Sequence, residues 1–121
     1  MDIVLALVFA VELSLLFIHE MDAIRQKEWR MFVVLKDMEE TRAYRVFTLI
    51  HLPLYIAVLT LLMVQPMAAY IIVDIFLIGH SLVHILFRAH KANALNSTYS
   101  RMLIYPMGML AIVHLGMLAF L

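Results

Sequence analysis

Four long apolar segments alternate with more polar ones along this chain of 121 residues. They cover about 3–21, 44–64, 67–88 and 102–121, and each is close to the ~20 residues that a helix needs to cross a bilayer. Inside hydrocarbon a chain must satisfy its own backbone hydrogen bonds, which a helix does within one segment. We therefore predict an all-α fold: a four-helix transmembrane bundle that makes residues 1–121 a single integral-membrane domain.

Positive charge lies on one side of these segments only. All nine Lys and Arg residues fall in or at the edges of the first and third connections: Arg25, Lys27, Arg30, Lys36, Arg42, Arg45, Arg88, Lys91 and Arg101. Cytoplasmic loops are enriched in Lys and Arg. We therefore predict a multi-pass protein of the inner (cytoplasmic) membrane, N-out/C-out, with both long loops in the cytoplasm. Aromatic residues among the charges after the first span predict an interfacial helical extension there.

Composition narrows the partners and the chemistry. Hydrophobic residues make up 65% of the chain and the mean hydropathy is +0.97, which is typical of membrane proteins. The absence of cysteine excludes disulfides, thiolate ligands and iron–sulfur clusters. The formal net charge is zero, so we expect no nucleic-acid partner. The partners we expect are the lipid bilayer and a small molecule dissolved in it.

Ionisable side chains recur inside the apolar segments, at least one in each. Glu12 lies in the first segment, His51 in the second, His80 and His84 in the third, and His114 in the fourth. Such residues are costly in hydrocarbon, face the bundle interior and usually mark a functional site. The set predicts a buried site shared by all four helices.

The depth of each residue follows from a rise of 1.5 Å per residue, counted from the cytoplasmic boundary. Glu12, His51 and His80 then lie roughly 9–15 Å inside, and His19 and His84 roughly 5 Å inside. The boundary is taken near Asp22, Arg45, Phe87 and Arg101. We expect the first three to meet in the bundle interior, with His19 and His84 at its cytoplasmic rim.

The spacing of His80 and His84 is typical of two ligands on one helical face, because residues four apart are neighbours on a helix. Imidazole and carboxylate ligands suit zinc or iron. We predict a divalent-metal site made by Glu12, His51, His80 and His84, with His19 as a further ligand or proton carrier. The leading prediction is a metal-binding membrane protein. In its more specific form, the protein is a metal-dependent enzyme that acts on a lipid-phase substrate. The sequence identifies no catalytic residue.

Two other interpretations stay open. In one, His51 and His80 are axial ligands of a b-type haem in a redox protein. In the other, the chain is a small accessory or structural subunit without a cofactor, whose histidines only hydrogen-bond neighbouring helices. A helix–helix hydrogen bond is the favoured role of Asp74 and His114 individually.

Two helix starts can be predicted from local sequence. Asp37, with Glu40 three residues later, matches a capping box and predicts that the second helix begins there. Asn96 or Ser97 is predicted to cap the fourth helix.

A more specific pattern runs through the chain. It comprises His-Glu-x-Asp-Ala-Ile at 19–24, Glu-Trp-Arg at 28–30, His-x-Pro at 51–53, Gly-His-x-x-x-His at 79–84 and Asn-Ser-x-x-Ser-Arg at 96–101. Together these motifs resemble an uncharacterised family of small bacterial membrane proteins, over almost the whole chain. The resemblance implies four membrane spans and no established activity.

Overall fold

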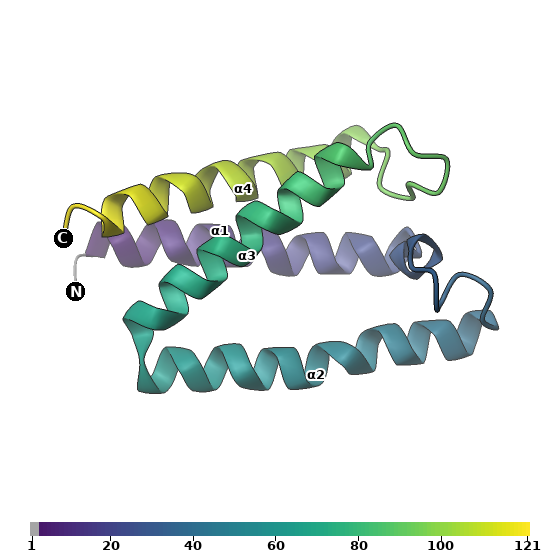
Figure 1. Ribbon diagram of the computed structural model, residues 1–121, viewed down its shortest axis with the longest axis horizontal. Helices are drawn as coiled ribbons and strands as arrows, with labels where there is room; N and C mark the ends of the chain where they lie inside the picture. The colour runs from purple at the N-terminus through teal and green to yellow at the C-terminus, as the bar shows by residue number, and fades with distance from the viewer. Residues whose placement is uncertain (1–2) are drawn as a thin grey trace.

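The computed structural model describes residues 3–121, which form helices joined by short connections. The long helices are α1 (Ile3–Arg25), α2 (Glu40–Val64), α3 (Pro66–Leu86) and α4 (Thr98–Leu118), and a short 3₁₀ helix, η1 (Glu28–Met31), follows α1 (Figure 1). Each long helix is long and apolar enough to cross a membrane. The predicted all-α, four-helix membrane fold is therefore confirmed, and no strand occurs in residues 3–121.

The helices are arranged unequally around the core. Helix α4 packs against both α1 and α3, whereas α2 packs mainly against α3. Helix α3 runs obliquely from the end of α2 to the start of α4 (Figure 1). Both chain ends lie at one end of the molecule, and the two long connections lie at the other. This is the arrangement that four successive membrane crossings require.

Small residues let α3 and α4 approach closely. A Cβ atom added to Gly108 on α4 would lie only 2.6 Å from both Cβ and Oγ of Ser81 on α3. The Ser81 hydroxyl donates a hydrogen bond of 3.0 Å to the backbone carbonyl of Ile104. Membrane helices use such small-residue contacts because no hydrophobic effect drives their association within lipid.

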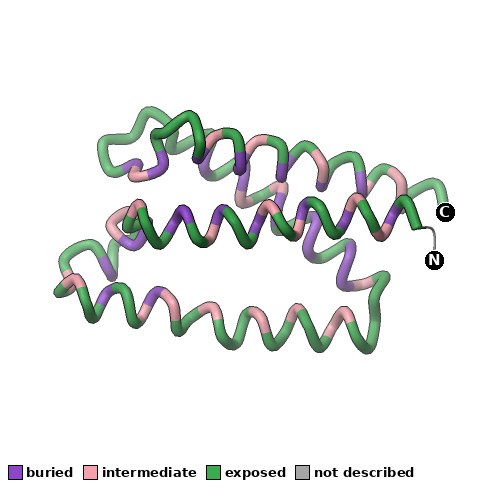
Figure 2. The backbone as a smooth tube through the Cα atoms, turned by 180° about the vertical axis from the view of Figure 1, so that it is seen from behind, coloured by how far each residue is buried: buried purple, intermediate pink, exposed green. Residues whose placement is uncertain are grey.

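Helix α2 is the least enclosed of the four. Its buried residues are Ala43 and Phe47, both near its start, and the rest of the helix is largely exposed (Figure 2). The exposed side chains are mostly apolar, such as Leu49, Leu52 and Leu59. In a bilayer these side chains face lipid, which costs little because lipid tails are as apolar as they are.

The connection between α1 and α2 folds back against the bundle. Lys27 has a φ of 57°, the left-handed conformation that reverses the chain, and η1 follows directly. The Trp29 side chain is buried, with its ring 5.6 Å from the ring of Phe47 on α2. The Glu40 carboxylate pairs with Lys27 and Arg30. These contacts hold η1 against the start of α2.

The predicted capping box is wrong by two residues. Helix α2 begins at Glu40, and Glu39 caps it by accepting hydrogen bonds from the backbone N–H groups of Thr41 and Arg42. These bonds lower the pKa of the Glu39 carboxyl below its usual range. The side chain of Glu40 is engaged by the cations of the η1 connection, so it does not serve a cap at Asp37.

The predicted cap of α4 is confirmed. The Ser97 side chain accepts a hydrogen bond of 2.9 Å from the backbone N–H of Ser100. The Ser100 hydroxyl in turn donates to Asp22 at 2.5 Å, which joins the start of α4 to the last turns of α1. Helix α4 therefore starts at Thr98, four residues before the predicted segment at 102.

The orientation in the membrane is a prediction from charge. We expect a reporter fused after Leu121 to report the outside and one fused after Lys91 to report the cytoplasm, because all Lys and Arg residues flank the two long connections. A pair of reporters, one active only outside and one only in the cytoplasm, would measure both positions. A cytoplasmic signal after Leu121 would contradict the predicted orientation.

Candidate metal centre

Three histidines and one carboxylate meet at the end of the bundle that carries the long connections. His19 comes from α1, His80 and His84 come from α3, and Glu28 comes from η1. One nitrogen or carboxylate oxygen from each lies within 4.8 Å of those from the other three. We call these four residues the histidine cluster. His19, Glu28 and His84 are buried and His80 is half-buried.

Within the histidine cluster the ring nitrogens face one another. His80 Nε2 lies 2.8 Å from His19 Nε2 and 3.2 Å from His84 Nε2. A neutral imidazole nitrogen carries either one proton or one lone pair, so His80 Nε2 has a single donor or acceptor position for two partners. A cation between the rings would accept a lone pair from all three nitrogens. The arrangement therefore suits metal coordination better than hydrogen bonding alone.

Glu28 supplies the negative charge of the histidine cluster. The left-handed turn at Lys27 brings η1 back beneath the bundle, and the Glu28 carboxylate lies 3.4 Å from His84 Nε2. Burial alone would raise the pKa of the Glu28 carboxyl. The hydrogen bond with His84 and the electrostatic effect of the neighbouring histidines outweigh burial and hold that pKa below its usual range. Glu28 is thus kept in the ionised form that binds cations.

A proton-holding pair lies beside the histidine cluster. His51 Nδ1 lies 2.7 Å from the backbone carbonyl of Phe47, and His51 Nε2 lies 2.9 Å from a carboxylate oxygen of Glu20. A carbonyl only accepts, so Nδ1 carries a proton. The contact of Nε2 with Glu20 needs a second proton, held by either partner. Glu20 and His51 together therefore hold one transferable proton.

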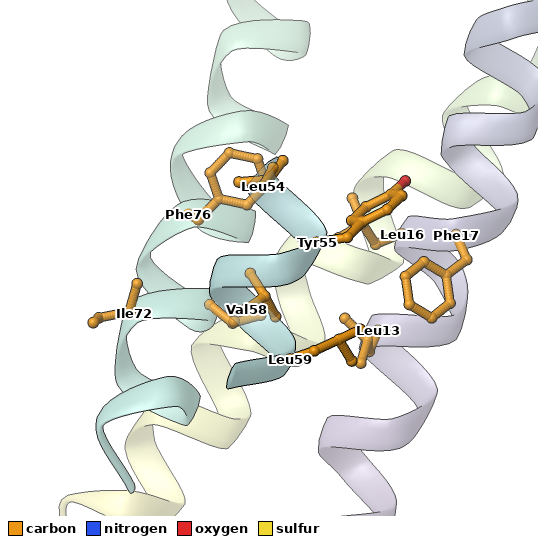
Figure 3. Close-up of a pocket in the computed structure, with 10 residues that line it drawn as sticks. Leu13, Leu16, Phe17, Leu54, Tyr55, Val58, Leu59, Ile72 and Phe76 are labelled. Atoms are coloured by element: carbon orange, nitrogen blue, oxygen red, sulfur yellow. The ribbon is translucent and has the colours of Figure 1, made fainter. Parts of the chain in front are cut away.

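Two cavities connect this region to the apolar face between α1, α2 and α3. One, of about 490 Å³, is lined by Glu20, Glu28, His51 and His80 together with apolar residues. The other, of about 380 Å³, is lined almost wholly by apolar side chains (Figure 3). Residues common to both linings are Leu16, Leu54, Tyr55 and Phe76. The two cavities thus adjoin, with a polar end at the histidine cluster and an apolar end between the helices.

Comparison with known proteins identifies a family for this chain but no characterised relative. The model of a family of unknown function, DUF6713, matches residues 5–120. The chain belongs to this family. No curated protein and no solved structure matches it. Membership agrees with the resemblance to an uncharacterised family, while the motif signature and the bacterial origin stay predictions. It supplies no activity, so function must be argued from the site.

The structure brings together three of the five predicted metal ligands. His19, His80 and His84 form the histidine cluster, and His51 lines the same cavity as His80. Glu12 lies elsewhere: its carboxylate is 3.5 Å from His114 Nδ1 and it belongs to a second group with Asp74. Glu12 therefore does not meet His51 and His80 in the bundle interior, contrary to the prediction from sequence; it lies with Asp74 and His114.

The sequence reasoning missed the carboxylates of the site. The sequence analysis proposed neither Glu28 nor Glu20 as a site residue, yet Glu28 is buried and Glu20 is half-buried against His51. Both belong to the motifs at 19–24 and 28–30, and this is the only signal that could have singled them out. Periodicity gave none, since Glu28 lies beyond the end of α1.

The Nε2 atoms of both predicted haem ligands face other side chains of the site. His51 Nε2 contacts Glu20, and His80 Nε2 contacts His19 and His84. A bis-histidine haem requires two ring nitrogens that face a common flat space. Nothing in the geometry of these two residues favours that alternative over the metal site.

Proposed function

We propose that this multi-pass membrane protein is a metalloprotein that binds zinc or iron through the histidine cluster. The observation that carries this proposal is the convergence of three imidazole nitrogens and one carboxylate oxygen within 4.8 Å of one another. Imidazole and carboxylate are the ligands that both metals accept. The three histidines would be held by α1 and α3, and Glu28 by the turn after α1.

The spacing of the donor atoms supports the same proposal. Ligands about 2.1 Å from a tetrahedral metal lie roughly 3.4 Å from one another. The separations between neighbouring donor atoms of the histidine cluster are 2.8, 3.2 and 3.4 Å, so a shift of a few tenths of an ångström would accommodate an ion. The single ionised carboxylate offsets part of the charge of a divalent cation.

The adjoining cavities favour an enzyme that acts on an amphiphile from the lipid phase. The apolar end would take a hydrocarbon chain, and the polar end would present the head of the same molecule to the histidine cluster. Glu20 and His51 line that end and hold a proton that can be given to or taken from a bound molecule. A bound metal would supply Lewis-acid chemistry, or redox chemistry with iron.

The metal content of the purified protein tests the proposal. We expect one zinc or iron per chain at the histidine cluster, and its loss in His84→Ala, because that change removes a nitrogen 3.2 Å from His80 and 3.4 Å from Glu28. Elemental analysis with an optical spectrum, on protein in detergent, would measure this. His90→Ala is the matched control, since His90 is an exposed loop residue.

Other results of the same measurement would contradict the proposal. An optical spectrum dominated by haem would favour the redox alternative. Wild-type protein with neither metal nor haem would leave the accessory-subunit interpretation, in which the histidines only join helices. Equal metal content in wild type, His84→Ala and His90→Ala would place any bound ion outside the histidine cluster.

A further inference from the structure

A second group of ionisable side chains lies deeper in the bundle. Glu12 on α1, Asp74 on α3 and His114 on α4 each have an exposed fraction of 0%. One ligand atom from each lies within 4.8 Å of those from the other two. We call these residues the acidic triad. Glu12 is seven residues before His19 on α1, which places the acidic triad about 10 Å further along that helix.

The donors and acceptors of the acidic triad do not balance. His114 Nδ1 lies 2.8 and 3.0 Å from the two oxygens of Asp74, so one N–H serves that carboxylate. No N–H or O–H of the described residues donates to either oxygen of Glu12, and His114 Nε2 has no hydrogen-bond partner among them. A buried carboxyl without a donor is costly. Glu12 also lies within hydrogen-bond reach of Asp74, so the two carboxyls must either share a proton or bind a cation between them.

The charge of the acidic triad also needs a counter-ion. Two carboxylates carry two negative charges, and the segments 3–24, 46–87 and 102–121 contain no Lys or Arg. Buried charges in proteins are paired or bind metals. One divalent cation would make two carboxylates and a neutral imidazole electrically neutral as a unit. A single proton would leave one negative charge in the interior.

We propose that the acidic triad is a second site for a divalent metal ion, separate from the histidine cluster. Its two oxygen donors and one nitrogen donor suit manganese, iron or zinc. The rings of Phe9 and Tyr70 enclose it, with centroids 5.4 and 5.3 Å from that of His114. An ion in this enclosed place would join α1, α3 and α4 and thereby stabilise the half of the bundle that holds the chain ends.

The number of zinc ions bound per chain tests this inference. We would dialyse the full-length protein in detergent against Zn²⁺ and measure bound zinc by elemental analysis. We expect two per chain in wild type, one in Asp74→Asn and one in Glu12→Gln, because each change removes a charged ligand of similar shape. Ser14→Ala should keep two, since Ser14 is an exposed residue of α1 that bonds the Ala10 carbonyl.

The His84→Ala variant separates this inference from the proposed function. If wild type binds two zinc ions and His84→Ala and Asp74→Asn each bind one, both sites exist. If wild type binds one zinc that Asp74→Asn loses and His84→Ala keeps, the acidic triad stands and the histidine cluster fails. Unchanged zinc in both Asp74→Asn and Glu12→Gln, relative to wild type, would overturn the second site.

Circular dichroism and size-exclusion chromatography would show whether the variants fold. If neither acidic-triad variant folds, the zinc content of His84→Ala decides. One zinc retained in that variant supports the acidic triad, and none overturns it. If the carboxyls of the acidic triad share a proton and bind no metal, His84→Ala should fold normally and bind no zinc.

Discussion

Metal should raise the thermal midpoint of wild-type protein in detergent, and it should raise that midpoint by less in His80→Ala, which keeps only the acidic triad as a metal site. A ligand that binds only the folded state stabilises it by about 2.7 kcal/mol at a hundredfold excess over its Kd. For a chain of this size that corresponds to a shift of roughly 5–20 °C. His80 is the residue to change because its Nε2 contacts two other histidines of the cluster.

The matched control is His90→Ala. His90 is exposed in the loop after α3, where its Nδ1 accepts a hydrogen bond of 3.1 Å from the backbone N–H of Ala92. We expect this variant to keep the full metal-dependent shift. The quantity to compare is the difference between metal-loaded and chelated samples of each variant, because His80→Ala also removes packing. A shift of equal size in His80→Ala would contradict the proposed ligand role.

Gly108→Ala should destabilise the bundle by about 1–3 kcal/mol, the usual cost of adding volume to a closely packed core. The new Cβ would lie 2.6 Å from both side-chain heavy atoms of Ser81, so α3 and α4 would have to move apart. That movement would also stretch the 3.0 Å hydrogen bond between Ser81 and the carbonyl of Ile104. The midpoint of unfolding in detergent, or in mixed micelles with a denaturing detergent, would measure the loss.

Two other helical glycines provide controls for this prediction. A Cβ added to Gly79 or Gly116 would meet nothing within 4 Å. Gly79→Ala and Gly116→Ala should therefore be neutral or slightly stabilising, because alanine is the better helix former. If all three substitutions had the same effect, the close approach of α3 and α4 at Gly108 would be contradicted.

The two groups of ionisable side chains divide the bundle into two layers along α1. His19 and Glu12 lie on the same helix and are both fully buried, yet they contact different partners. Between them on α1 lies the buried Leu16, and Leu77 lies between Asp74 and His80 on α3; both belong to one apolar core cluster with Met107 of α4. The apolar layer keeps the two groups electrostatically separate, so substitutions in one should leave metal binding in the other intact.

Sequence alone was sufficient for the number of helices and for the choice of most polar residues. Four apolar segments of about twenty residues have one stable form in a bilayer, and ionisable residues inside them must face the interior. The pairing of His80 with His84 also follows from sequence, because residues four apart on a helix are neighbours. The structure keeps these features: both rings belong to the histidine cluster.

Tertiary structure decided which carboxylate accompanies which histidine. Counting depth from Asp22 placed Glu12 about 15 Å inside, level with His51 and His80. Helix α1 continues to Arg25, so Glu12 lies about 20 Å from that end of the helix. Counted in the same way from Thr98, the start of α4, His114 lies about 24 Å inside, whereas His80 lies only about 9 Å from the end of α3. Helix α3 crosses obliquely and brings Asp74 to the same layer.

The place of Glu28 in the histidine cluster was likewise decided by the tertiary structure. Its place among the histidines depends on the left-handed turn at Lys27 and on the packing of Trp29 against α2. Neither feature has a periodic signature, because both arise in a connection and not within a helix. Sequence thus determined which side chains must be hidden from lipid, while helix ends, helix tilt and one reversed loop determined which of them meet.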